Sequence, residues 1–326
     1  MKSDRPGYPL VPALTSRSGR LLRFAVSLGL LAFVLSRVPA AGLLEVLSSA
    51  HAPWLWGAVG ISVLIELVLA TRLTVIARVQ DIALPLVRAV QIDLAAKFYG
   101  LFAPGSNLSA SAVRAYKLAR QPGDPLGAVA SIVFDRLIAT ASLGAVGQAF
   151  WLLEGPPDTA SVGLVLAGTW ILPLTAYLVA AKTRASGRFV AWWHPAWWER
   201  TTQSVARFRD MRVGPLSGIA AASMTVHLLD VTLYTMLAAS LRIDISFVSM
   251  GWISTATTVV TMLPISVSGL GLREGALVYL LGLYGVSPSS AIALSLLYFT
   301  ARYLLTGLLG GILEVRGEGR PEVRGQ

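Results

Sequence analysis

Four arginines lie in strongly apolar parts of this sequence, where a charge placed in hydrocarbon is costly and is a candidate for function. Arg114 and Arg273 each follow a short polar run, and Arg136 and Arg302 each lie in the apolar segment that comes next. Arginine is permanently charged and presents a fork of N–H donors that fits phosphate oxygens. The matched positions therefore predict a site for an anion, with a phosphate group as the best fit.

The polar run before Arg273, in TMLPISVSGLGLR, interrupts apolar sequence with a proline, two serines and two glycines. Backbone at membrane depth is irregular only where it is buried in protein or lines a wet cavity. We therefore expect two half-helices to meet here. The returning one should begin near Ser268–Gly269, so that its free N–H groups and positive end point into the protein. Glycine at 269 and 271 predicts positive φ or close helix approach.

A weaker copy of this pattern precedes Arg114, in LFAPGSNLSASAVRAYKLAR. Pro104 corresponds to Pro264, and the returning arm should begin near Asn107–Ser109. Each copy is followed by an apolar segment that holds an arginine. Two such matches predict an internal repeat, which is a common plan of membrane transporters.

The predicted substrate-binding residues are the four arginines, the glutamate after Arg273 and the residues of the two breaks: Arg114, Arg136, Arg273, Arg302, Glu274, Pro104, Gly105, Ser106, Asn107, Pro264, Ser268, Gly269 and Gly271. The predicted proton carriers or ion-pair partners are Glu66, Asp93, Asp135, His227 and Asp230. The sequence predicts no metal site and no cofactor.

A structural alternative stays open, in which the arginines only pair with carboxylates such as Asp135, Glu274 and Asp230 to hold the helices together. Lys97 stands four residues after Asp93 on one helix face and could pair with it. Arg72 could extend to the cytoplasmic interface.

The composition is that of an integral membrane protein. Of 326 residues, 55% are hydrophobic and 13% are charged, and the mean hydropathy is +0.66. Soluble domains normally carry about 25% charged residues. The absence of cysteine excludes disulfides and thiolate metal sites. We expect most of the net charge of +10 in cytoplasmic loops that face anionic headgroups, and not on a surface for nucleic acid.

Six segments are long and apolar enough to cross a hydrocarbon core, which needs about 20 residues. They are 21–38, 54–77, 127–153, 161–181, 215–241 and 288–313. Two further segments, 86–119 and 246–285, are too polar or too interrupted for one span. We predict that both are re-entrant helical hairpins, which gives an all-α polytopic protein with six full spans and two hairpins.

The distribution of lysine and arginine predicts the orientation. Loops 39–53 and 154–158 contain neither, whereas loop 182–212 contains seven and is predicted to be cytoplasmic. Segments 1–20 and 314–326 are then cytoplasmic as well. The first repeat, 21–153, starts inside and the second, 154–313, starts outside, so the two hairpins enter from opposite faces. This is an inverted-topology repeat, which suits alternating access to a site at the midplane.

The second polar run and its continuation, LPISVSGLGLREGALVYLLGLYGVSPSSAIALSLLYFTARYLLTGLLGGILE, resemble the C-terminal hallmark of the lysylphosphatidylglycerol synthase transmembrane family. FYGLFAPGSNLSASAVRAYKLAR, followed by ASIVFDRL, resembles its first hallmark, although Gly105-Ser106-Asn107 departs from the usual Pro-Gly-Gly-Gly-like run. The resemblance covers the chain from Leu21 to Glu314.

In that family the region is the flippase part of multiple peptide resistance factors, which move aminoacylated phosphatidylglycerol across the bacterial inner membrane. The resemblance also implies stand-alone members linked to hopanoid, glycolipid or polyprenyl-phosphate pathways. Only residues 314–326 follow the last predicted span. We therefore expect a stand-alone flippase part without the soluble aminoacyl-transferase domain.

The predicted function is translocation of a phosphate-bearing lipid across the bacterial inner membrane, by a transporter and not an enzyme. The lipid could be an aminoacyl-phospholipid, a glycolipid or a polyprenyl-phosphate-linked lipid. Its partners would be lipids with anionic headgroups, with a homo-oligomer or a lipid-biosynthetic enzyme as further partners. The alternatives are an intramembrane enzyme that acts on a lipid phosphate and a scaffold for a lipid-modifying enzyme. The sequence contains no HExxH or GxxxxGK[ST] motif.

Overall fold

The computed structural model describes residues 45–102, 106–176, 178, 195–263, 266 and 268–318. Every regular element in these ranges is helical. The predicted first span at 21–38 and the N-terminal segment 1–20 lie outside the described residues, as do residues 319–326 of the predicted C-terminal tail.

Four long helical segments are apolar enough to cross a membrane. They are α3 (Ala52–Val79), α6 (Pro125–Glu154), α10 (Val213–Ser240) and the continuous stretch Pro288–Arg316. The last comprises α13 (Pro288–Phe299), the π-helix η3 (Thr300–Leu304) and the start of α14 (Leu305–Glu318). The sequence predicted helices at these four places, and the structure confirms them.

The predicted span at 161–181 is described only in part. After the 3₁₀ turn η2 (Pro157–Thr159), α7 (Ala160–Gly168) begins, and a turn at 169–170 interrupts it before a further helical stretch. The apolar segment Ala160–Ala176 is shorter than the four long helices. The remainder of this predicted span lies almost wholly outside the described residues.

Two pairs of shorter helices flank the breaks that the sequence indicated. The first pair is α4 (Leu86–Phe102) and α5 (Ser106–Ala119), and the second is α11 (Phe247–Thr261) and α12 (Leu272–Gly282). None has the roughly 20 residues that a full span needs. The two helices of each pair contact one another. The structure therefore has a helical hairpin within each predicted segment, 86–119 and 246–285.

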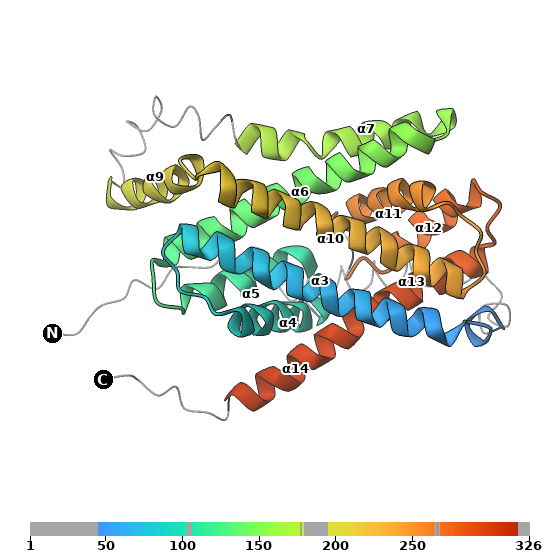
Figure 1. The fold of residues 1–326 in the computed structure, drawn as a ribbon, viewed down its shortest axis with the longest axis horizontal. Helices are drawn as coiled ribbons and strands as arrows, with labels where there is room; N and C mark the ends of the chain where they lie inside the picture. The colour runs from blue at the N-terminus through green and yellow to red at the C-terminus, as the bar shows by residue number, and fades with distance from the viewer. Residues whose placement is uncertain are drawn as a thin grey trace.

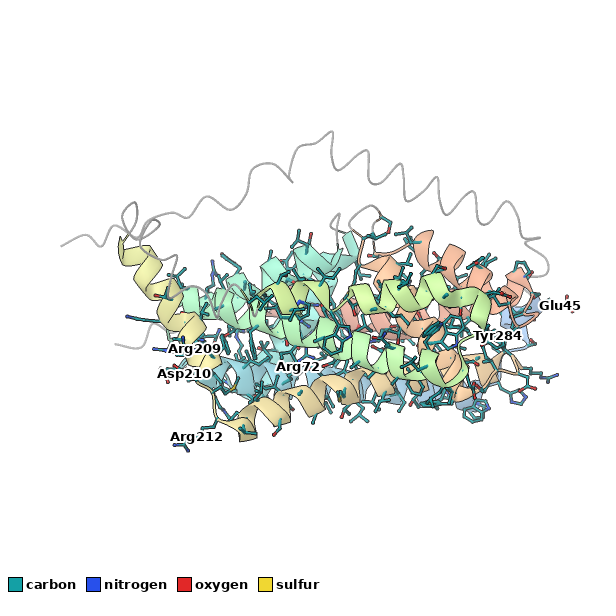
Figure 2. The ribbon with its side chains drawn as sticks, turned by 90° about the horizontal axis from the view of Figure 1, so that it is seen from above. Glu45, Arg72, Arg209, Asp210, Arg212 and Tyr284 are labelled. Atoms are coloured by element: carbon teal, nitrogen blue, oxygen red, sulfur yellow. The ribbon has the colours of Figure 1, made fainter. Side chains whose placement is uncertain are left out.

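The two hairpins lie toward opposite ends of the long helices. Figure 1 shows α4 and α5 beside the left half of α3, and α11 and α12 beside the right half of α10. Figure 2 shows Arg209, Asp210 and Arg212 at one end of the molecule and Glu45 and Tyr284 at the other. An inverted repeat requires this placement, and the symmetry itself stays a prediction.

Local sequence determines where several helices begin. The Asp124 side chain accepts hydrogen bonds from the amides of Leu126 and Gly127 at the start of α6, and Pro125 is the first helical residue. Ser287 caps α13 in the same way, by accepting from the amide of Ser290. Such caps satisfy amides that have no partner within the helix.

Close packing of α14 on α4 depends on glycine. A Cβ atom at Gly310 would lie 2.0 Å from the carbonyl oxygen of Leu94, and one at Gly307 would lie 2.5 Å from the Leu101 side chain. Small residues allow helix backbones to approach closely inside a membrane. This contact brings the C-terminal helix against the first hairpin, and an ion pair of 2.5 Å between Lys117 of α5 and Glu314 of α14 joins their ends.

The predicted cytoplasmic loop contains a helix, α9 (Pro195–Arg209), in its described part. The Phe208 ring stacks on Phe134 of α6 with centroids 4.2 Å apart, and the Gln80 side chain donates a hydrogen bond to the Ser204 carbonyl. The loop is therefore attached to the ends of α3 and α6.

Candidate functional site: an arginine-rich cavity between the hairpins

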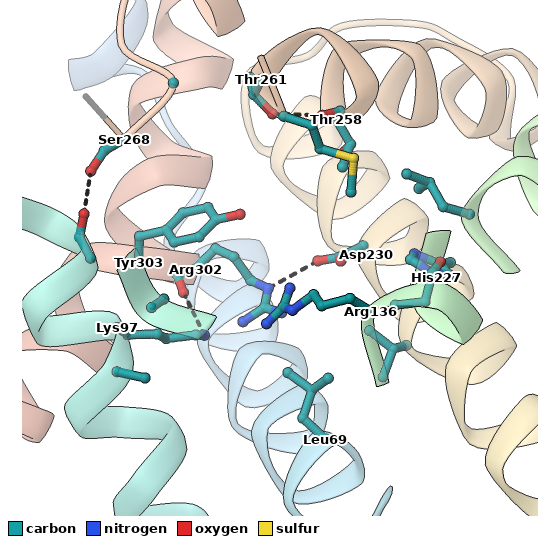
Figure 3. A pocket seen from close by; sticks show the side chains of 18 of the residues that line it. Leu69, Lys97, Arg136, His227, Asp230, Thr258, Thr261, Ser268, Arg302 and Tyr303 are labelled. Atoms are coloured by element: carbon teal, nitrogen blue, oxygen red, sulfur yellow. Dashed lines mark hydrogen bonds and ion pairs between the residues drawn. The ribbon is translucent and has the colours of Figure 1, made fainter. Parts of the chain in front are cut away.

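A cavity of about 160 Å³ lies where the hairpins and the long helices meet. All four arginines that the sequence singled out line it: Arg114, Arg136, Arg273 and Arg302. Two further cations, Arg72 and Lys97, line it as well. Figure 3 shows Arg136, His227, Asp230 and Arg302 around this space. A single water needs about 10–15 Å³ on the same measure, so the cavity has room for a group the size of a phosphate.

The tips of the two hairpins meet beside the cavity. Ser268, in the second break, donates its hydroxyl toward the carbonyls of Gly100 at 3.3 Å and Leu101 at 3.2 Å. Both carbonyls belong to the last turn of α4, next to the first break (Figure 3). The backbone irregularity that the sequence predicted thus lies against the cavity, in agreement with the rule for irregular backbone at membrane depth.

The second break adopts left-handed backbone conformations. The φ angles are 53° at Ser268, 72° at Gly269 and 81° at Gly271, a region that glycine enters without steric cost. The prediction of positive φ at the two glycines is confirmed. Glu274 then fixes the start of α12, because its side chain accepts a hydrogen bond of 2.6 Å from the Gly271 amide.

Glu274 itself lies outside the cavity wall. It is completely buried, and its second oxygen accepts a hydrogen bond of 2.6 Å from the Ser295 hydroxyl. Both oxygens therefore have partners that hold the hairpin in place. This geometry gives Glu274 a capping role; direct contact with a substrate stays a prediction.

One group of ion pairs connects the first hairpin to the long helices. Asp135 of α6 lies 2.7 Å from Arg72 of α3 and 3.7 Å from Arg114 of α5. Arg114 also lies 2.8 Å from Asp93 of α4. The alternative in which Asp93 pairs with Lys97 is therefore wrong, because Asp93 pairs with Arg114 across the hairpin instead.

A second group of ion pairs surrounds Arg302. Its guanidinium lies 2.5 Å from Glu66 and 3.0 Å from Asp230, and Glu66 also pairs with Lys97. Lys97 donates a second hydrogen bond of 3.1 Å to the main-chain carbonyl of Arg302. Arg302 lies in η3, the π-helical turn, and such turns often occur at functional sites.

Arg72 and Lys97 are the two cations of the cavity wall that the sequence analysis did not assign to the site. The Arg72 side chain is only 3% exposed and pairs with Asp135, so the expectation that it extends to the interface is wrong. Arg72 lies in α3 and Lys97 in α4, and both line the same cavity as the assigned arginines. A charge within an apolar segment was the signal that could have identified both residues. The sequence analysis instead gave Arg72 a place at the interface and Lys97 a pairing with Asp93.

Arg136 and Arg273 differ from the other cations, because neither has an ion-pair partner among the residues that the structure describes. The Nε of Arg136 is buried without a hydrogen-bond partner, and so is the Nη1 of Arg273. The other terminal nitrogen of Arg273 donates to the Ser268 carbonyl at 3.0 Å. Pairing with carboxylates therefore explains Arg114 and Arg302, but it does not explain these two arginines.

Aromatic rings support the Arg273 guanidinium. Its central carbon lies 5.4 Å from the ring centroid of Tyr303 and 5.6 Å from those of Tyr298 and Phe299. Rings attract a cation electrostatically and do not neutralise it. The rings therefore hold the guanidinium in place without forming an ion pair with it.

The cavity wall carries an excess of positive charge. Six cations line it, and the carboxylates paired with them are Glu66, Asp93, Asp135 and Asp230. The difference corresponds to Arg136 and Arg273. Glu274, next to Arg273 in sequence, does not compensate this excess, because the Gly271 amide and the Ser295 hydroxyl occupy its oxygens.

The remaining predicted residues divide into two groups. His227 lines the cavity and its Nε2 lies 3.0 Å from the Ala139 carbonyl, so this nitrogen carries the proton and donates. Ser268, Gly269 and Asp230 also line the cavity. The others belong to the two breaks: Pro104, Gly105 and Pro264 lie outside the described residues, as do the side chains of Ser106 and Asn107.

Comparison with known proteins adds one finding to this geometry. No curated protein matches the chain. Residues 20–310 match the family described as the lysylphosphatidylglycerol synthase TM region. The match includes both hairpins and every residue of the cavity wall, and the chain therefore belongs to the family of lysylphosphatidylglycerol synthase transmembrane regions.

Proposed function

We propose that this protein translocates a lipid with a phosphate-bearing headgroup across the bacterial inner membrane, with both termini in the cytoplasm. The headgroup enters the cavity between the hairpins while the hydrocarbon tail stays in the bilayer. The protein acts as a transporter, without modification of the lipid. Membership of the family supports a role in membrane lipid metabolism.

The observation that carries the proposal is the pair of uncompensated arginines, Arg136 and Arg273. A buried charge without a partner costs several kcal/mol, by order of magnitude, and is retained where it has a ligand. Arginine offers phosphate two parallel hydrogen bonds from one planar group. Arg136 and Arg273 both line the cavity, and each keeps a buried nitrogen without a hydrogen-bond partner.

The hairpin arrangement supports transport over static binding. The two hairpins lie beside different halves of the long helices (Figure 1). Residues next to both breaks, among them Leu101 and Ser268, line the cavity. Movement of one tip would open the cavity toward one membrane face while the other tip keeps it closed. Hairpins and broken helices around a midplane site are the usual elements of alternating access.

The ends of the helices support the proposed orientation. The last turns of α3, α5 and α14 contain Arg78, Lys117 and Arg316, and α9 carries Arg207 and Arg209. Figure 1 places these turns at the end of the molecule from which α4 starts. At the other end, Arg242 and Asp244 follow α10, and Glu154 ends α6. This end therefore has no excess of positive charge in these turns. Cytoplasmic loops carry the excess of lysine and arginine.

Leaflet-resolved transport tests this proposal. Purified protein is reconstituted into liposomes with a trace of a fluorescent phosphatidic acid, and the outer leaflet is quenched chemically. We expect faster loss of protected fluorescence than in protein-free liposomes, with the recovered lipid unchanged in mass. Modified lipid would support the enzyme alternative, and unchanged protection with unmodified lipid would refute translocation of this lipid class.

A further inference from the structure

The charges around the cavity also bear on which phosphate lipids it accepts. The name of the family refers to lysylphosphatidylglycerol, whose single phosphate is outweighed by the two ammonium groups of the lysyl moiety. A lipid of that kind brings a net positive headgroup. Free carboxylates at the cavity wall would be the strongest partners for those ammonium groups.

The described wall supplies one carboxylate, Asp230, and one of its two oxygens is engaged. Its Oδ1 lies 3.0 Å from the Nε of Arg302 and 3.4 Å from the Tyr298 hydroxyl. Its side chain is 24% exposed. An ammonium group at this position would stand beside the Arg302 guanidinium, and like charges placed together oppose binding.

The other carboxylates near the cavity are withdrawn from it. The side chains of Glu66, Asp93 and Asp135 are 6%, 1% and 3% exposed, and none of them lines the cavity. Each lies behind a cation that faces the cavity: Lys97 and Arg302 cover Glu66, and Arg72 and Arg114 cover Asp135 and Asp93. A headgroup in the cavity therefore meets a layer of cations.

We infer that the headgroup bound in this cavity is net anionic, a lipid phosphate without an ammonium group, and that cationic aminoacyl-phospholipids are excluded. This inference rests on the proposed function and narrows it. The unpaired charges of Arg136 and Arg273 select for the phosphate, and the layer of cations selects against the aminoacyl group. The volume of about 160 Å³ also favours a compact headgroup.

Competition binding with lipids of identical acyl chains tests the inference. Protein in detergent is saturated with fluorescent phosphatidic acid, and unlabelled phosphatidic acid, phosphatidylglycerol or lysylphosphatidylglycerol is added. We expect the two anionic lipids to compete and lysylphosphatidylglycerol to compete at least about tenfold more weakly, because an added like charge opposes binding. Equal or stronger competition by lysylphosphatidylglycerol would overturn the inference.

A charge-reversal variant provides the second arm. Arg136→Glu places a carboxylate at the wall, so the preference for phosphatidic acid over lysylphosphatidylglycerol should shrink or reverse. Arg136→Gln removes the charge without reversing it, and its preference should lie between those of the wild type and Arg136→Glu. If folded Arg136→Glu keeps the wild-type preference for phosphatidic acid over lysylphosphatidylglycerol, the inference is contradicted. If Arg136→Glu does not fold, an unchanged preference in Arg136→Gln contradicts it.

The two arms distinguish this inference from the proposed function. If lysylphosphatidylglycerol binds best in the wild type and Arg136→Gln weakens the binding of every lipid, the phosphate site stands and the inference about the headgroup falls. If no lipid competes with labelled phosphatidic acid in the folded wild type, both fall.

Discussion

Replacement of Arg273 by glutamine should separate ligand binding from stability. The variant loses the hydrogen bond of 3.0 Å to the Ser268 carbonyl and the three ring contacts at 5.4–5.6 Å. Contacts of these kinds contribute about 1–3 kcal/mol. The variant also removes a buried charge without an ion-pair partner, whose desolvation costs several kcal/mol by order of magnitude. These two effects oppose each other, so the ligand-free protein should stay within about 1 kcal/mol of wild-type stability.

Binding should respond differently. Loss of a charge-assisted hydrogen bond to phosphate costs about 1.5–3 kcal/mol, which is more than tenfold in affinity. Arg273→Lys keeps the charge and loses the planar fork, so it should weaken binding by less. The assays are thermal unfolding of the detergent-solubilised protein and equilibrium binding of phosphatidic acid.

Arg302→Gln is the matched control. Arg302 pairs with Glu66 at 2.5 Å and Asp230 at 3.0 Å, so its removal leaves buried carboxylates with less compensation. Breaking a buried pair destabilises by about 3–5 kcal/mol. Addition of Asp230→Asn should restore part of that stability. If Arg273→Gln destabilised the protein as strongly as Arg302→Gln, Arg273 would be a structural residue and our reasoning on the unpaired charge would be refuted.

Three further predictions concern the hairpins. Cysteine at Ser106 should react with polar thiol reagents mainly from the cytoplasm and cysteine at Ser268 mainly from outside; labelling of both from one side would contradict the inverted repeat. Gly269→Leu should abolish transport while membrane insertion persists. The φ of 72° at Gly269 is unfavourable for other residues, and a Cβ there would lie 3.0 Å from a neighbouring side chain. Retained transport would show that this backbone conformation is dispensable. Gly310→Ala should lower the thermal midpoint more than Gly282→Ala, since a Cβ at 310 meets backbone at 2.0 Å and one at 282 meets nothing within 4 Å; equal midpoints would show that α14 does not depend on this close contact.

The local features of the fold could be predicted from sequence because they depend on length and composition. Four predicted spans correspond to long apolar helices. Proline and glycine at the two breaks predicted short helices on either side, and α4, α5, α11 and α12 are too short to span. The matched spacing of the four arginines also predicted that they act together, and all four line one cavity.

The ion pairs could not be predicted, because they join residues far apart in the chain. Glu66 pairs with Lys97, 31 residues away, and with Arg302, 236 residues away. Local spacing favoured Asp93 with Lys97, and the tertiary contact with Arg114 prevailed. The π-helical turn at Thr300–Leu304 has no proline or glycine to indicate it. Which arginines stay unpaired is therefore a property of the assembled helices.

The most direct test of the central claim is the rate of lipid translocation by the double variant Arg136→Gln/Arg273→Gln in proteoliposomes. Arg207→Gln is the control, because its ion pair with Asp81 is exposed and contributes little. We predict that the double variant folds and inserts but moves fluorescent phosphatidic acid no faster than protein-free liposomes do, while the control moves it at the wild-type rate. Wild-type translocation by the folded double variant would contradict the claim that the cavity binds the transported phosphate.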